Sequence, residues 1–263
     1  MNTIRARRRS PAPWRVLLGV WLLVWGAAHA GLAQKIPRIK ESIVGVGTLM
    51  PTRQPPGEFL GTGFVVGGGR LALTNAHVLP SSLDTDRKER LVLFVGEGQD
   101  GEVRRARKVA LDARHDLALL RFEGPALPSL SLGDSDRVRE GERYAFTGFP
   151  IGMVLGLHPV THRGIVSAVT PIATPMGKAR QLDPALVERL GDPYEVFQLD
   201  ATAYPGNSGS PLYDPERGRV VGVVNMVFVK ESKEAMLEKP SGITYAIPIK
   251  HALRLLRRKG ALD

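Results

Sequence analysis

Short runs of apolar and β-branched residues, broken by glycine and proline, dominate the chain from residue 42 onward. Runs of this length between turn residues predict β-strands. A Pro/Gly loop at 51–59, three glycines at 67–69 and Asp100-Gly101 separate several of them as turns. The expected strands are 42–50, 61–66, 70–74, 91–95, 103–111, 117–122, 143–148, 164–169, 197–200, 220–229 and 242–247.

A proline-rich stretch at 124–129 divides these strands into two groups. We place the boundary between two β units within 123–135, which gives units 34–130 and 131–263. In the second unit, 185–190 fits a short helical turn. At the end of the chain, 249–258 has helical spacing, with Ile249, Ala252, Leu253 and Leu256 on one face and Gly260 as a stop. This pattern predicts a C-terminal amphipathic helix packed on the strands.

The first 33 residues have the features of a secretory signal peptide. Five arginines precede an apolar run at 16–28, which is shorter than the roughly 20 residues of a membrane-spanning helix. Small residues favour cleavage before Gly31 or Gln34. The sequence therefore predicts a periplasmic or secreted protein. The alternative is an uncleaved segment that anchors the protein to the inner membrane, and only that alternative implies membrane contact.

Composition supports a folded all-β body. In 263 residues, 43% are hydrophobic and 24% charged, and 29 glycines and 20 prolines suit a fold with many turns. Five of the ten net positive charges come from the first 33 residues, so nucleic acid is not an expected partner. The absence of cysteine excludes disulfides and thiol nucleophiles. No metal motif such as HExxH occurs, and no metal or cofactor is expected.

Three segments carry candidate chemistry. His77 lies in TNAHV (74–78) at a strand end, and Asp116 immediately precedes an apolar strand. Each is a weak signal alone, because both residue types are common in turns. Ser208 lies in the more specific segment PGNSGSPL (205–212). Its glycines allow a sharp turn that brings the amides of Gly206 and Ser208 to one side, where they could face a developing oxyanion.

In the order His, Asp, Ser, these segments resemble the trypsin-like (chymotrypsin-fold) serine proteases, and most of all the protease domain of the HtrA/Deg family. The resemblance covers nearly all of the chain after the signal segment. Its further motifs are GTGF (61–64), LGDS (132–135), TGFP (147–150), GIVSA (164–168), VGVVN (221–225) and YAIP (245–248). It implies two six-stranded antiparallel β-barrels, with His77 and Asp116 in the first, Ser208 in the second, and a short C-terminal helix.

The resemblance also implies roles. Ser208 would be the nucleophile, His77 the general base and Asp116 the residue that orients His77. The amides of Gly206 and Ser208 would form the oxyanion hole. His115 is a second candidate for the base. Its neighbour Asp116 is better placed at the strand entrance, and adjacent side chains in a strand point to opposite faces, so we prefer His77 as the base.

The same resemblance places the substrate pocket. Thr202, six residues before the nucleophile, would line its bottom, so cleavage after Arg or Lys is not favoured. The walls would come from Thr202, Ala203 and Tyr204, and from Asn225, Met226, Val227 and Phe228. These residues favour a small or medium aliphatic side chain at the cleavage site.

Three departures limit the analogy. Asn207 replaces the carboxylate that pairs with a new amino terminus in digestive zymogens, so that activation is not expected and Ile43-Val44-Gly45 is simply part of the first strand. Ser210 replaces the usual glycine of the nucleophile motif. Only 15 residues follow Pro248, so no PDZ domain is expected.

Two functions therefore follow from the sequence. The first is an exported serine endopeptidase that hydrolyses protein or peptide substrates, in extracytoplasmic quality control. The alternative is a catalytically latent or inactive protease fold that serves as a binding or chaperone module. No oligomeric state is predicted.

Overall fold

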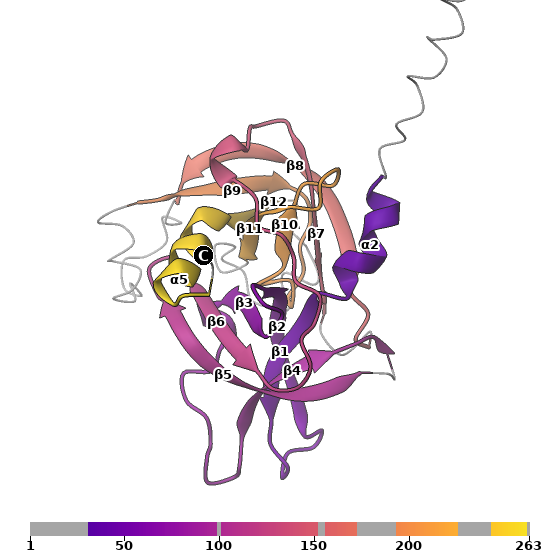
Figure 1. Ribbon diagram of the computed structural model, residues 1–263, viewed down its shortest axis with the longest axis vertical. Coiled ribbons are helices and arrows are strands. Elements are labelled where there is room, and N and C mark those ends of the chain that lie inside the picture. The colour runs from indigo at the N-terminus through magenta and orange to yellow at the C-terminus, as the bar shows by residue number, and fades with distance from the viewer. Residues whose placement is uncertain (1–30, 99–100, 152–155, 173–192, 226–242, 262–263) are drawn as a thin grey trace, which may run out of the picture.

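The computed structural model describes residues 31–98, 101–151, 156–172, 193–225 and 243–261. Residues 1–30 of the signal segment, the possible turn at 185–190 and residues 226–228 of the expected pocket lie outside these ranges. In the described ranges, each helix is too short or too polar to cross a bilayer. The described part of the chain is mostly β, with a helix at 32–40 before the strands and a helix at 249–258 after them (Figure 1).

The first six strands close into an antiparallel barrel. They are β1 (Ile43–Leu49), β2 (Gly57–Val66), β3 (Leu71–Asn75), β4 (Arg90–Val95), β5 (Glu102–Asp112) and β6 (Leu117–Phe122). The order around the barrel is β1-β2-β3-β6-β5-β4. Its β1 strand pairs with both β2 and β4, which closes the sheet.

The second six strands repeat this arrangement. They are β7 (Arg143–Gly148), β8 (Val160–Pro171), β9 (Glu195–Asp200), β10 (Pro211–Tyr213), β11 (Val220–Asn225) and β12 (Ile243–Pro248). Their order is β10-β11-β12-β9-β8-β7, with β10 pairing to β7 to close the barrel. The expected fold of two six-stranded antiparallel barrels is confirmed.

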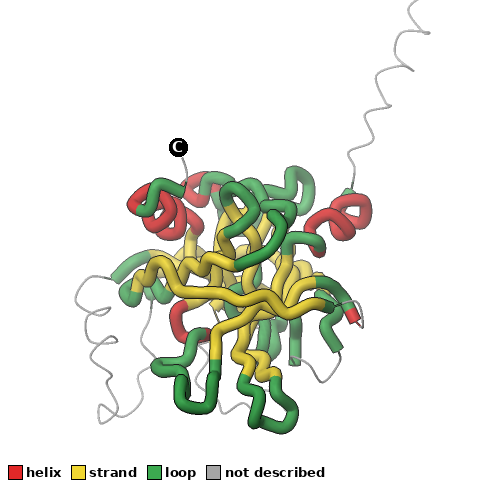
Figure 2. Tube along the Cα trace, turned by 60° about the horizontal axis from the view of Figure 1, so that its bottom comes forward, coloured by secondary structure: helices red, strands yellow, loops and turns green. Residues whose placement is uncertain are grey.

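The helices before β1 and after β12 lie on the outside of the barrels (Figure 2). The C-terminal helix α5 (Ile249–Arg258) has the predicted bounds and buries Ile249, Ala252 and Leu256. Leu253 is only partly buried, whereas Leu255, which was not expected on the inner face, is buried. The helix α2 (Leu32–Lys40) was not predicted, and it occupies the start of the range that we assigned to the first barrel.

The segment between the barrels bonds to both of them. Leu130 donates its N–H to the Val65 carbonyl in the first barrel, at 2.9 Å. The next residue, Ser131, accepts from Val220 N–H in the second barrel, also at 2.9 Å. Leu132 forms a parallel bridge with Val220. The connection thus fixes one barrel against the other.

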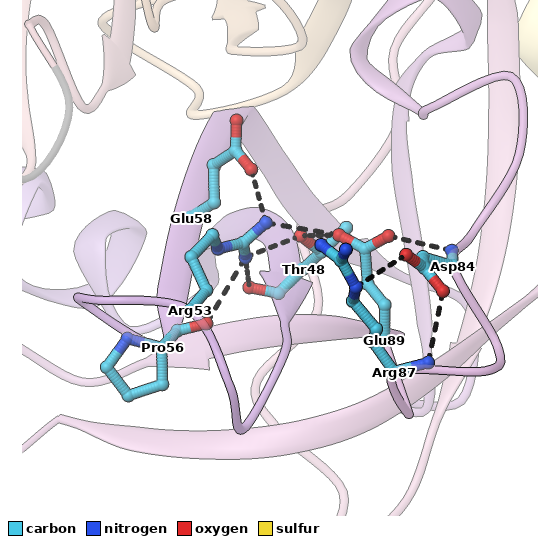
Figure 3. A network of polar contacts seen from close by, with 7 residues as sticks. All are labelled: Thr48, Arg53, Pro56, Glu58, Asp84, Arg87 and Glu89. Atoms are coloured by element: carbon cyan, nitrogen blue, oxygen red, sulfur yellow. Dashed lines mark hydrogen bonds and ion pairs between the residues drawn. The ribbon is translucent and has the colours of Figure 1, made fainter.

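A polar network ties two loops together at one end of the first barrel (Figure 3). Arg53 donates to Glu58 at 2.6 Å, to Glu89 at 3.1 Å and to the Thr48 hydroxyl at 2.9 Å. Glu89 also accepts from the backbone N–H of Asp84, and this bond, with one from Thr48, lowers the pKa of its carboxyl group. The hydrogen bonds of Arg53 therefore hold the loop at 51–59, which the sequence analysis described only as a Pro/Gly loop.

A buried histidine lies where α5 meets the first barrel. The ring of His251 stacks on that of His115, with centroids 3.9 Å apart, and Tyr194 meets it edge-on at 5.2 Å. His251 is 4% exposed, and its ring nitrogens have no hydrogen-bond partner among the described residues. Burial, aided by the nearby positive charges, lowers the pKa of His251 to about 3.

Candidate active site

His77 is presented by a short 3₁₀ turn, Ala76–Val78, that directly follows β3. Its side chain is 31% exposed, so one edge of the imidazole faces solvent. The Nδ1–H donates to Asp116 Oδ2 at 2.6 Å, since a carboxylate oxygen can only accept. The Nε2 atom is thereby left as the acceptor, and Ser208 Oγ lies 3.0 Å from it.

Asp116 is held in a turn just before β6, with a φ of 52° that non-glycine residues rarely adopt. Its backbone carbonyl accepts from Ala76 N–H at 3.0 Å and from the Asn75 side-chain amide at 3.1 Å. The carboxylate also accepts the His77 backbone N–H at 2.9 Å. These bonds dock the Asp116 turn onto the His77 turn and fix the carboxylate against the imidazole.

Asn225, which we expect in the wall of the substrate pocket, contacts the proposed triad. It ends β11, is fully buried and donates from Nδ2 to Asp116 Oδ2 at 2.6 Å. Its amide group thus supports the carboxylate of Asp116. A polar residue at the end of the otherwise apolar strand VVGVVN was the available sequence signal, but its partner lies 109 positions away.

The loop that carries Ser208 turns sharply at two glycines, with a φ of 102° at Gly206 and 89° at Gly209. A β-carbon at Gly209 would overlap the carbonyl oxygen of Thr62, so only glycine fits there. Ser208 itself is 6% exposed. Its hydroxyl is therefore held within the structure and directed at His77.

The N–H groups of Gly206 and Ser208 remain available. In the described part of the chain, neither donates to any acceptor, whereas Asn207 N–H donates to Tyr204 O at 3.0 Å. A pair of unbonded N–H groups beside a nucleophile suits an oxyanion. The oxyanion hole expected from the N–H groups of Gly206 and Ser208 stays a prediction.

The remaining expected residues divide into three cases. Thr202 and Tyr204 are partly exposed beside the nucleophile loop, while Ala203 is 4% exposed and packs in the core of the second barrel. Met226, Val227 and Phe228 lie outside the described residues. His115 pairs with Asp112 through Nδ1, at 2.8 Å, and stacks on His251. The structure thus places His115 beside Asp112 and His251, whereas His77 is the histidine that contacts Ser208.

The described residues contain no group of three or more His, Cys, Asp or Glu side chains that could hold a metal ion. The hydrogen bonds around Ser208 can support the chemistry of an activated hydroxyl. Ser208, His77 and Asp116 form one continuous hydrogen-bonded chain across the two barrels.

The chain is similar to known serine endoproteases. A probable periplasmic serine endoprotease DegP-like from Pseudomonas putida is 34% identical over 202 residues, which is 76% of this chain and 35% of that protein. A protein of the same name from Halomonas elongata is 31% identical over 244 residues, covering 88% of this chain and 44% of that protein. The chain therefore spans less than half the length of these relatives.

Solved structures give the same result. The HtrA-type protease AlgW with a decapeptide aligns with a TM-score of 0.62 and 25% identity, over 86% of this chain and 66% of that one. The same protease with a tripeptide aligns with a TM-score of 0.62 and 26% identity, over 86% and 62%. The trypsin-like peptidase domain family matches residues 61–223, a range that includes His77, Asp116 and Ser208. The chain belongs to the family of trypsin-like peptidases.

Proposed function

We propose that this protein is a serine endopeptidase in which Ser208 is the nucleophile, His77 the general base and Asp116 the residue that orients it. The observation that carries the proposal is the hydrogen-bonded chain from Ser208 Oγ through His77 to Asp116. With Nδ1–H committed to Asp116, the imidazole presents Nε2 to the hydroxyl in the tautomer that can accept its proton.

Peptide hydrolysis at this site would proceed through acylation and then deacylation of Ser208. Ser208 Oγ forms a bond to the scissile carbonyl carbon as its proton passes to His77 Nε2. The carbonyl oxygen becomes an oxyanion that accepts from the N–H groups of Gly206 and Ser208. His77 then gives its proton to the leaving amine, and the C–N bond breaks. Water then bonds to the acyl carbon as its proton passes to the same Nε2, the bond from that carbon to Ser208 Oγ breaks, and His77 returns the proton to Oγ.

Most of the rate acceleration would come from the two N–H donors. Loss of one such donor lowers kcat by about 10²–10³, or roughly 2.7–4 kcal/mol. Asn225 would contribute less directly, as a positioning residue. Its bond to Asp116 Oδ2 holds the same oxygen atom that accepts from His77 Nδ1.

Peptides are the proposed substrates. The aligned AlgW structures hold a decapeptide or a tripeptide, and the site here is solvent-accessible at His77. Thr202 offers no carboxylate to a basic side chain, so we propose cleavage after small or medium aliphatic residues. The names of the relatives include the word periplasmic, and together with the signal-like segment they support an extracytoplasmic role in protein quality control.

The test is covalent labelling with a fluorophosphonate probe, which requires an activated serine but no known substrate. Wild-type protein should label with one equivalent, and both Ser208→Ala and His77→Ala should not. Ser131→Ala changes an exposed serine outside the site and serves as the matched control. Labelling that survives in Ser208→Ala would overturn the assignment. Folded wild-type protein that does not label would favour the binding module.

A further inference from the structure

Thr62 is a fully buried residue of β2 that contacts the nucleophile loop at two points. Its backbone N–H donates to the Ser208 carbonyl at 2.9 Å. Its hydroxyl donates to the Gly206 carbonyl at 2.6 Å. Thr62 belongs to the first barrel, whereas both partners belong to the second, and they are the two residues whose N–H groups would bind the oxyanion.

The same hydroxyl is also an acceptor. Phe149 N–H donates to Thr62 Oγ1 at 3.0 Å, in a fully buried position. A hydroxyl has one proton to give, so the bond from Phe149 leaves that proton for the Gly206 carbonyl. The two bonds therefore fix both the position of Oγ1 and the direction in which it donates.

These contacts complete the restraint of three successive peptide groups. The C=O and N–H of a trans peptide point in opposite directions within one plane, so a bond to one fixes the other. Pro205 O accepts from Ile151 N–H at 2.7 Å, which directs the N–H of Gly206. Asn207 O accepts from Ser210 N–H at 3.0 Å, which directs the N–H of Ser208.

The peptide between these two is the one that Thr62 holds. Its carbonyl is that of Gly206, bonded to Thr62 Oγ1, and its N–H is that of Asn207, bonded to Tyr204 O. Rotation of this peptide changes the angle between the two oxyanion donors. Gly206, at a φ of 102°, offers little steric resistance to such rotation. In the described part of the chain, Thr62 is the sole donor to the Gly206 carbonyl.

We propose that Thr62 is a positioning residue for the oxyanion hole, which sets the relative direction of its two N–H donors from the opposite barrel. The inference rests on the proposed function and adds a residue to it. Thr62 touches no reacting atom. Its effect passes through the peptide that joins Gly206 to Asn207.

The experiment separates the hydroxyl from the rest of the side chain. Thr62→Val keeps the shape and loses the hydroxyl, and Thr62→Ser keeps the hydroxyl. Thr48→Val is the matched control, because Thr48 is also buried in the first barrel but its hydroxyl bonds to Glu89, outside the site. For each protein, the second-order rate constant and the final extent of fluorophosphonate labelling are measured. The phosphonyl oxygen of the probe occupies the same hole as the oxyanion.

We expect Thr62→Val to label 10- to 100-fold more slowly than wild type but to the same final extent. The loss is smaller than that for removal of a donor, because both N–H groups remain and only their alignment loosens. Thr62→Ser should label within about threefold of the wild-type rate, and Thr48→Val within about twofold. The pH midpoint of labelling should not move, since His77 and Asp116 are unaltered.

Several results would overturn the inference. A wild-type rate in Thr62→Val would show that the bond to Gly206 is dispensable. Equal slowing in Thr62→Ser would assign the effect to packing, and a reduced final extent at an unchanged rate would assign it to partial unfolding. If Thr62→Val does not fold, Thr62→Ala replaces it with the same expectation. Wild-type protein that does not label overturns the proposed function, and this inference with it.

Discussion

Replacement of His251 by phenylalanine should make the folded protein less sensitive to acid. His251 is 4% exposed, stacked on His115 and edge-on to Tyr194. Its ring nitrogens have no hydrogen-bond partner in the described part of the chain, so protonation would place a charge in a site that cannot solvate it. Phenylalanine keeps the ring contacts and removes the titratable group.

The magnitude follows from the two pKa values. Burial holds the pKa of His251 at about 3 in the folded protein, against 6.5 when the chain is unfolded. Below pH 6.5 the unfolded chain therefore takes up a proton that the folded protein does not, and stability falls as the pH decreases toward 3. At pH 5 the difference is about 1.5 pH units, or about 2 kcal/mol lost through this single residue.

Urea denaturation at pH 7 and pH 5 measures the effect. Far-UV circular dichroism is the suitable signal, because all three tryptophans lie in the first 25 residues. The loss of unfolding free energy between the two pH values should be about 2 kcal/mol smaller in His251→Phe than in wild type. His158→Phe, at a side chain that is 60% exposed, should behave as wild type. An equal loss in His251→Phe and wild type would refute the reasoning.

Two further substitutions test packing and the polar network, both by thermal or urea unfolding. Gly148→Ala places a β-carbon on the hydroxyl of Ser210 and should lower the free energy of unfolding by about 1–3 kcal/mol. Gly68→Ala is the control, because Gly68 has open space around it, and it should change the free energy of unfolding by less than about 0.5 kcal/mol. Arg53→Met leaves the carboxylate of Glu89, 13% exposed, without its cationic partner and should cost about 1–3 kcal/mol. Arg87→Met, at 68% exposure, should cost less than about 0.5 kcal/mol, and equal costs would contradict the network's importance.

The sequence predicted most strands because their apolar runs end at strong turn signals. It failed where that signal is weak. The strand β10 has only three residues and begins with Pro211, too short for any periodicity to appear. The helix α2 contains Pro37, which argues against a helix on local grounds.

Among the site residues, too, those with a strong sequence signal were found and those with a weak signal were missed. The three residues of the proposed triad lie in recognisable motifs, and the structure brings them together. The sequence did not reveal the contacts of Asn225 and Thr62, because β11 and the second half of β2 are buried on both faces and alternation does not show where these side chains point. Their partners are also far away, 109 positions for Asn225 and 144 for Thr62. Only the docking of the two barrels defines these contacts.

Closure of both barrels has a consequence for solubility. Each strand in the described ranges has a hydrogen-bonded neighbour on both sides, so these strands offer no free edge to another extended chain. Open edges recruit unfolded polypeptides into intermolecular sheets, which is a common route to aggregation. In the described ranges, the two barrels therefore offer an unfolded polypeptide no strand with which to begin such a sheet.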